Sequence, residues 1–144
     1  MILSIIVPAY NEDKTIIQIL EKLRETKSNK VSYQVIVVND CSNDNTRSLL
    51  EANDHLYDIL INNSSNIGKG GSVKKALECT EGEYVIFQDA DFEYDPSDLA
   101  KFVNLISKFK PDVILGSRFN YDRYTKSHNF FNKMGNYFLS FLFN

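Results

Sequence analysis

Cysteine is scarce in this sequence of 144 residues. Cys41 and Cys79 stand far apart, and there is no Cys-x-x-Cys pair and no cysteine–histidine cluster. This spacing signals neither a zinc site nor a disulfide framework, and it fits a reducing, cytoplasmic setting. An excess of positive charge is also missing, since the formal net charge is -3. The charge of the sequence therefore does not indicate a basic surface that would bind nucleic acid.

Long apolar runs are missing as well. Residues 1–8 lack the basic start and the small-residue cleavage site of a signal peptide. Their apolar run has the length of a strand, so we expect no secretory leader and no transmembrane segment in this chain.

Two glycine-rich nucleotide motifs are absent. The segment Pro8 to Glu12 contains no glycine, whereas a dinucleotide-binding fold needs Gly-x-Gly-x-x-Gly after its first strand. The loop Gly68 to Ser72 does not fulfil the P-loop pattern. An NAD enzyme and a P-loop nucleotidase are therefore both disfavoured. Gly70 and Gly71 would still let backbone amides approach a diphosphate at a helix start.

What is present is the pattern of one globular α/β domain, which we expect to cover residues 1–144. With 43% hydrophobic residues, the chain can bury a real core. Short β-branched runs predict strands at residues 3–7, 34–38, 58–61, 84–87 and 113–115. Apolar residues recur with helical period at Ile16, Ile19, Leu20 and Leu23, and again at Leu99, Phe102, Val103 and Ile106. This alternation predicts a mostly parallel sheet with helices on both faces.

The second of these helices has a clear start signal. Asp95 is the expected N-cap, Pro96 takes the first helical position, and Asp98 lies in the first turn.

Polar clusters follow each predicted strand. They are residues 8–12, 39–46, 66–71, 89–95 and 116–118. Ligands of open parallel sheets bind beyond the carboxyl ends of the strands, so we expect one edge of the sheet to carry the site.

Asp89 and Asp91 are the most informative of these residues, because they directly follow the apolar run 84–87. Two carboxylates this close repel each other unless a cation offsets them. Magnesium needs only one or two protein carboxylates and fills its other positions with water and phosphate oxygens. The alternative is a solvated acidic turn that caps the next helix.

Five blocks of this sequence resemble the family 2 glycosyltransferases of GT-A fold. The blocks are Ile5-Ile6-Val7-Pro8-Ala9-Tyr10-Asn11-Glu12, residues 37–46, Asn66-Ile67-Gly68-Lys69-Gly70-Gly71, residues 88–96 and Gly116-Ser117-Arg118-Phe119. Within the family, the chain is most similar to the dolichyl-phosphate or polyprenyl-phosphate mannosyltransferase branch.

The resemblance implies a nucleotide-sugar site. Pro8, Tyr10 and Glu12 would line the nucleoside pocket, Asp40 would accept a hydrogen bond from the base, and Lys69 would lie near the nucleotide. The plainer readings are a half-buried aromatic ring for Tyr10 and a solvated lysine at a helix start for Lys69.

The resemblance also implies a metal and an acceptor site. Asp89 and Asp91 would hold Mg or Mn on the diphosphate, with Glu93 as a candidate third ligand. Asp89, Asp91 and Arg118 would then be the catalytic residues, with Arg118 binding an acceptor phosphate, unless it merely pairs with a surface acid. His128 matches a basic stretch that such enzymes carry.

The chain departs from the family pattern in two places. The usual Asp-Asp-Gly-Ser block is Asn39-Asp40-Cys41-Ser42 here, which puts the tightness of that turn in doubt. Residues 130–142 form an apolar helical face, and we expect the acceptor-side segment that follows it in the family to be missing. This face would pack on the domain's own core, or else on a partner or a membrane surface.

The sequence therefore predicts an inverting, metal-dependent transfer of mannose or glucose from GDP-mannose or a UDP-hexose to a polyprenyl or dolichyl phosphate. A lipid phosphate is already anionic near neutral pH and needs no protein base. The setting would be the cytoplasm or the cytoplasmic face of a membrane. Two alternatives stay open, namely transfer to a glycan hydroxyl and a noncatalytic nucleotide-sugar-binding remnant. A receiver-like signalling domain built on Asp40 is disfavoured, because the first strand is not followed by an acidic pair.

Overall fold

The computed structural model describes residues 1–26 and 31–116, and it confirms the α/β fold class. The elements in chain order are β1 (Ile2–Ala9), α1 (Ile16–Glu25), β2 (Ser32–Asn39), α2 (Thr46–Ala52), a 3-10 turn (Asp54–Leu56), β3 (Ile59–Asn62), α3 (Gly68–Leu77), β4 (Tyr84–Phe87), a second 3-10 turn (Pro96–Asp98) and α4 (Leu99–Phe109). The chain divides into two compact units, Met1–Pro111 and Asp112–Asn144, and all of these elements belong to the first. The assignment of the chain to a single domain stays a prediction.

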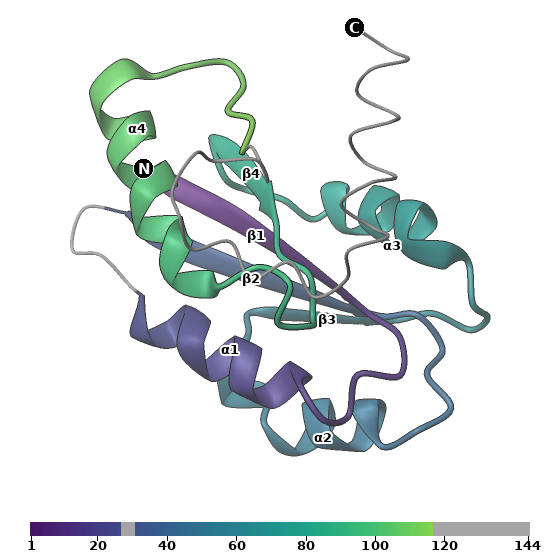
Figure 1. Ribbon diagram of the computed structural model, residues 1–144. Helices are drawn as coiled ribbons and strands as arrows, with labels where there is room; N and C mark the ends of the chain where they lie inside the picture. Colours follow the sequence, from purple (N-terminus) through teal and green to yellow (C-terminus); the bar gives the residue numbers. More distant parts are fainter. Residues whose placement is uncertain (27–30, 117–144) are drawn as a thin grey trace, which may run out of the picture. The chain divides into compact units, whose positions relative to one another are not determined.

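The four strands form one parallel sheet in the order β3-β2-β1-β4. β1 and β2 pair over their whole length, from Ile2 opposite Ser32 to Ala9 opposite Asn39. Figure 1 shows α3 on one side of this sheet, and α1 and α2 on the other. Because the strands are parallel, their carboxyl ends meet at one edge, as the sequence predicts.

The core lies on both faces of the sheet. Ile6, Ile36 and Val38 pack with Ala76 of α3 on one face. Alternate residues of the same strands, including Ile5 and Val37, point to the opposite face and are fully buried. On α1, the four apolar residues that define the helical period are also fully buried: Ile16, Ile19, Leu20 and Leu23. This burial on two faces explains why β1 and β2 read as nearly continuous apolar runs.

A buried polar network anchors the amino end of the sheet. The Ser4 hydroxyl donates to Gln34 Oε1 at 2.6 Å and accepts from the Gly82 amide at 2.9 Å. Gln34 Oε1 also accepts from the Glu81 amide at 2.9 Å, and its Nε2 donates to the Cys79 carbonyl at 3.2 Å. These bonds tie the connection between α3 and β4 to β1 and β2, and so fix where β4 begins.

Two local expectations need correction. The predicted strand at residues 113–115 is wrong, because this segment has no regular structure and Val113 and Leu115 are 73% and 88% exposed. A β-branched run forms a strand only where another strand supplies hydrogen-bond partners. Asp95 does cap a helix start, since its Oδ1 accepts from the Ser97 amide at 3.0 Å. However, that first turn is a 3-10 turn, and α4 begins at Leu99.

Among the described residues, no helix is long and apolar enough to cross a membrane. Arg118, His128 and the apolar face at 130–142 lie outside the described residues.

Candidate functional site

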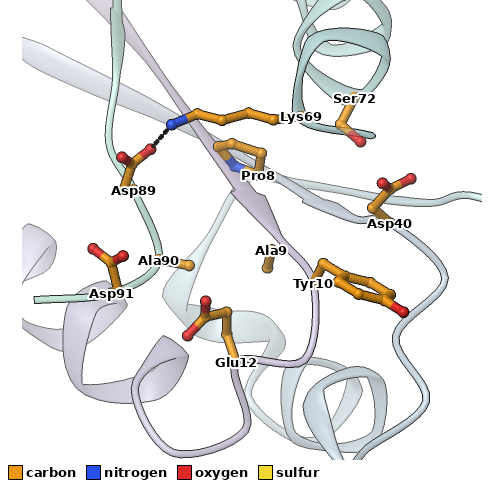
Figure 2. A pocket seen from close by; sticks show the side chains of 10 residues that line it. All are labelled: Pro8, Ala9, Tyr10, Glu12, Asp40, Lys69, Ser72, Asp89, Ala90 and Asp91. Carbon is orange, nitrogen blue, oxygen red and sulfur yellow. Dashed lines mark hydrogen bonds and ion pairs between the residues drawn. The ribbon is translucent and has the colours of Figure 1, made fainter. Parts of the chain in front are cut away.

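A cleft of about 200 Å³ opens at the carboxyl edge of the sheet. Its lining residues are Pro8, Ala9, Tyr10, Glu12, Asp40, Lys69, Ser72, Asp89, Ala90 and Asp91 (Figure 2). Most of the side chains that the sequence singles out thus come together at one place. The sequence pattern does not single out Ala9, Ser72 and Ala90, because small residues next to a motif carry no chemical signal. Glu93 is not among the residues that line the cleft.

The loop after β1 is held by the loop after β2. The Asn11 amide donates to Ser42 Oγ at 3.0 Å, and Asn11 Oδ1 accepts from the Asn43 amide at 2.8 Å. The Asn43 side chain in turn donates to the Tyr10 hydroxyl at 3.3 Å. Tyr10 is 43% exposed, so this contact orients an accessible ring at the mouth of the cleft.

Both loops contain a left-handed backbone position. Asn11 has φ 57°, which asparagine tolerates well, and Cys41 has φ 58°. Cys41 stands where the resembling family usually has glycine. The tight turn is therefore kept, and a cysteine adopts the backbone conformation that normally favours glycine.

A second set of bonds continues the same connection. Thr46 Oγ1 accepts from the Glu12 amide at 2.8 Å, and Asp44 Oδ2 accepts from the Asp13 amide at 3.2 Å. Asp44 Oδ1 accepts from the Thr46 amide at 2.9 Å. Burial alone would raise the pKa of Asp44, but the hydrogen bonds from Thr46 and Asp13 outweigh it and lower the pKa. The polar block at 42–46 thus fixes the loop that carries Tyr10 and Glu12.

Asp40 is 3% exposed and lies under the start of α3. Its Oδ1 accepts from Asn63 Nδ2 at 2.7 Å and from the Ile67 amide at 3.0 Å. Its Oδ2 accepts from the Gly68 amide at 2.8 Å. Burial would raise the pKa of Asp40, but these bonds, together with one from Ser72, lower it below its usual value. Asp40 is therefore a buried, ionised carboxylate at neutral pH.

Lys69 and Asp89 form an ion pair across the cleft (Figure 2). The Lys69 side chain is 61% exposed, whereas that of Asp89 is 20% exposed. Because an exposed ion pair contributes only about 0–1 kcal/mol to stability, the Lys69 ammonium group can readily leave Asp89 for another anionic partner.

The loop after β4 is shaped by its own hydrogen bonds. Gln88 is buried, and its Nε2 donates to the carbonyls of Asp89 and Tyr94, each at 3.1 Å. Asp91 Oδ1 accepts from the Glu93 amide at 2.9 Å. These contacts fold the loop back on itself and leave the carboxylates of Asp89 and Asp91 at the cleft wall. Gln88 belongs to the sequence motif, but the motif does not reveal that its side chain holds the loop after β4 through these two hydrogen bonds.

The charge of the cleft suits a hard divalent cation. Four lining residues are acids, Glu12, Asp40, Asp89 and Asp91, and one, Lys69, is a base. An anionic ligand would be repelled by this wall unless a cation entered with it. Carboxylate oxygens are the ligands that Mg²⁺ and similar cations prefer. Within residues 1–26 and 31–116, no group of three or more acidic, histidine or cysteine side chains is arranged around a metal position, so Asp89 and Asp91 would act as a pair.

The chain is similar to known proteins over most of its length. The family described as "Glycosyl transferase family 2" matches residues 4–141. The dolichyl-phosphate beta-glucosyltransferase ALG5D of Trichomonas vaginalis is 34% identical over 140 residues, which are 89% of this chain and 43% of that protein. The poly(ribitol-phosphate) beta-N-acetylglucosaminyltransferase TarS of Staphylococcus aureus is 34% identical over 78% of this chain and 20% of that protein. The chain thus spans half or less of the length of the curated relatives it matches.

Solved structures show the same fold. S. aureus TarS 1–349 in complex with UDP superposes with a TM-score of 0.69 at 30% identity, over 88% of this chain and 39% of that one. The mannosyltransferase PcManGT from Pyrobaculum calidifontis, in complex with GDP-Man and Mn²⁺, gives a TM-score of 0.62 at 30% identity, over 74% of this chain and 32% of that one.

Proposed function

This chain belongs to glycosyl transferase family 2, and on that basis we propose that its cleft binds the nucleoside diphosphate of a sugar donor together with Mg²⁺ or Mn²⁺. The observation that carries the proposal is the acidic wall of Asp89 and Asp91 beside the displaceable cation of Lys69. A diphosphate needs positive charge, and among the described residues that line this cleft Lys69 is the basic one, so a bound cation would supply the rest. Neighbours in complex with UDP and with GDP-Man and Mn²⁺ support this assignment.

Each lining residue has a role in this proposal. The exposed ring of Tyr10 offers a surface for the base, and Pro8 and Glu12 complete the wall of the nucleoside pocket. Lys69 exchanges Asp89 for a phosphate oxygen when the donor enters, while Asp89 and Asp91 hold the cation. Glu93 stays a candidate third ligand, although it does not line the cleft.

The reaction would be transfer of a hexose with inversion. A bound divalent cation would supply Lewis-acid stabilisation of the diphosphate as it leaves the sugar carbon. Asp89 and Asp91 would fix the position of that charge, and the polar block at 42–46 would fix the base end of the donor. Arg118, outside the described residues, is proposed to bind the acceptor phosphate through its guanidinium.

The acceptor is proposed to be a polyprenyl or dolichyl phosphate, and the sugar mannose or glucose. Several relatives are dolichyl-phosphate beta-glucosyltransferases, which supports a lipid phosphate as the acceptor. The poly(ribitol-phosphate) enzymes among the relatives keep a hydroxyl acceptor open. Donor binding without transfer is the second candidate, because the residues that line the cleft have proposed roles toward the donor. A cytoplasmic setting, with contact to the membrane face, stays a prediction.

A thermal-shift experiment tests the donor site. We would measure the melting temperature with GDP-mannose, UDP-glucose and UDP-GlcNAc, each with and without Mn²⁺. A ligand at one hundred times its Kd adds about 2.7 kcal/mol of stability, and for a chain of this size that corresponds to a shift of roughly 5–10 °C. We expect one donor to give such a shift only in the presence of Mn²⁺.

Asp91→Ala should abolish the shift, because it removes half of the carboxylate pair. Glu21→Ala is the matched control, since it removes one negative charge from an exposed position on α1 that does not line the cleft. If no donor shifts the wild-type melting temperature, this chain does not assemble a donor site. Binding without transfer to dolichyl phosphate would favour the noncatalytic candidate.

A further inference from the structure

Gln88 is a buried polar residue that directly follows β4. It is 4% exposed, and its backbone amide donates to the Ile6 carbonyl at 3.0 Å, so it continues the pairing of β4 with β1 by one residue. It does not line the cleft, although the neighbouring Asp89 does. Burying an amide side chain is unfavourable unless the amide finds hydrogen-bond partners. The place of Gln88 is therefore explained by contacts within the protein.

The partners of Gln88 lie at the two ends of the acidic loop, by which we mean residues 89–94. Gln88 Nε2 donates to the carbonyls of Asp89 and Tyr94, each at 3.1 Å. An amide NH₂ group has two hydrogens, so one nitrogen can serve both carbonyls. No helix or strand spans residues 88–95, so the ladder bonds of regular structure do not fix this segment. The Gln88 side chain closes the loop as a cross-link would.

We propose that Gln88 is a positioning residue: by closing the acidic loop, it fixes the carboxylate of Asp91 relative to that of Asp89. This inference rests on the proposed function, in which the two carboxylates hold the divalent cation. It assigns no ligand contact to Gln88 itself.

The two carboxylates depend on Gln88 to different degrees. Asp89 lies one residue beyond the backbone pairing of β4 with β1, so the sheet sets its place. Asp91 lies within the loop, and its Oδ1 accepts from the Glu93 amide at 2.9 Å. The direction of the Asp91 side chain is thus set by the loop backbone that Gln88 closes. Loss of this closure would leave Asp89 in place and release Asp91.

The outer side of the loop is held more weakly. Phe92 is 47% exposed, and Lys22 Nζ of α1 lies 5.3 Å from the centroid of its ring. A cation–π contact at so exposed a site contributes little. Asp95 caps the following turn through the Ser97 amide and so fixes the chain only beyond the loop. Among these contacts, the buried bonds of Gln88 are the ones that hold the loop closed.

A divalent cation would need this closure. Mg²⁺ demands near-octahedral geometry, so two carboxylates bind it together only when their spacing is fixed. Residues that orient metal ligands without touching the metal typically change metal affinity by about 10–100-fold when they are substituted. This range sets the size of the effect that we expect from Gln88.

Calorimetric titration with Mn²⁺ tests the role of Gln88. Gln88→Met keeps most of the side-chain volume and removes both donors. Gln34→Met is the matched control, because Gln34 is also buried and also donates to a backbone carbonyl, that of Cys79 at 3.2 Å, toward the opposite end of the sheet. Mn²⁺ would be titrated into each chain in the presence of UDP or of GDP, at a temperature where melting curves show every chain to be folded.

We expect the Mn²⁺ affinity to fall about 10–100-fold in Gln88→Met and to stay within about twofold of the wild type in Gln34→Met. Unchanged affinity in Gln88→Met would overturn the proposal. An equal loss in both variants would overturn it as well, because the effect would then follow from lower stability in general.

Gln88→Glu separates position from charge. It keeps the shape of the side chain, offers at most one donor hydrogen for the two carbonyls, and adds a negative charge when it is ionised. If the position of Asp91 decides the affinity, Mn²⁺ should bind about tenfold more weakly here as well. Tighter binding would mean that the charge of the loop decides it, and would contradict the proposal.

Nuclear magnetic resonance without any ligand distinguishes this inference from the donor site itself. Order parameters from ¹⁵N relaxation should be about 0.85 for residues 90–93 in the wild type and clearly lower in Gln88→Met. In the wild type, the side-chain amide hydrogens of Gln88 should exchange at least about tenfold more slowly than those of Gln18, which is exposed on α1. Unchanged order parameters, or equal exchange of the two side chains, would overturn the closure directly. Lower order parameters in a protein whose wild type binds neither nucleotide would support the closure and count against the donor site alone.

Discussion

Gly82 provides the sharpest test of how the amino end of the sheet is built. A Cβ atom at this position would lie 2.5 Å from the Ser4 nitrogen, 2.7 Å from Ser4 Oγ and 2.7 Å from the Tyr84 carbonyl oxygen. Two of these atoms belong to the backbone, which cannot rotate away as a side chain can. Gly82→Ala must therefore move the entry to β4 away from β1.

The size of the effect follows from these contacts. Forcing an extra carbon into a packed site costs about 1–3 kcal/mol. The shift also weakens the 2.9 Å hydrogen bond from the Gly82 amide to Ser4 Oγ, and this loss adds about 1 kcal/mol. We therefore expect Gly82→Ala to lose roughly 2–4 kcal/mol in the free energy of unfolding and about 6–12 °C in melting temperature.

Gly70→Ala is the matched control. A Cβ atom at Gly70 meets nothing within 4 Å, and the residue lies in α3, where alanine is favoured over glycine by about 0.5–1 kcal/mol. The same substitution should thus destabilise at one glycine and stabilise at the other. Urea unfolding, fitted with the same dependence of free energy on urea concentration for each variant, would measure both changes in the free energy of unfolding. A Gly82→Ala chain within about 0.5 kcal/mol of the wild type would refute the argument from close contact.

Two further outcomes are expected. Cys41→Gly should stabilise the chain by up to about 1 kcal/mol, because it relieves a left-handed non-glycine backbone at φ 58°, and a clear fall in the urea midpoint would contradict this. The pKa values of Asp40, Asp44 and Asp95 lie below the usual 3.8 in the folded chain, since hydrogen bonds to each carboxylate outweigh its burial. Their contribution to stability is therefore complete above that pH and is lost as the pH falls below it through the folded values. The melting temperature should be constant above about pH 5 and fall steeply with pH below about pH 4. In Asp40→Asn this fall should be less steep, and an equally steep fall would contradict the stabilising role of the Asp40 carboxylate.

Much of the fold could be predicted because it depends on local periodicity. β1 and β2 are buried on both faces, so their sequences are almost continuously apolar, and the α1 residues at helical spacing are all buried. The segment at 113–115 has the same composition as a strand, but no local signal tells whether a neighbouring strand will pair with it. The 3-10 turn at Pro96 likewise differs from an α-helical turn only in the span of its hydrogen bonds, which is shorter by one residue.

The candidate site was predictable in its location but not in its internal contacts. The rule that ligands bind beyond parallel strands placed Tyr10, Lys69 and Asp89 together without knowledge of any distance. The bond from Asp13 to Asp44 joins residues 31 positions apart, and the bond from Gly68 to Asp40 joins residues 28 apart. Such contacts follow from sheet order and loop conformation, which the sequence pattern does not contain. Asp40 was therefore assigned to a ligand, whereas its visible partners belong to the protein.

The polar network at Ser4 and Gln34 has a consequence for engineering. It lies toward the opposite end of β1 from the cleft, and the five residue steps from Ser4 to Ala9 span roughly 17 Å of extended chain. Substitutions that far apart usually have additive free energies. Changes that strengthen the Ser4 end should therefore raise the tolerance of the protein to substitutions at Tyr10 or Lys69. Stability and donor preference could then be changed independently, because the two ends of β1 are far enough apart.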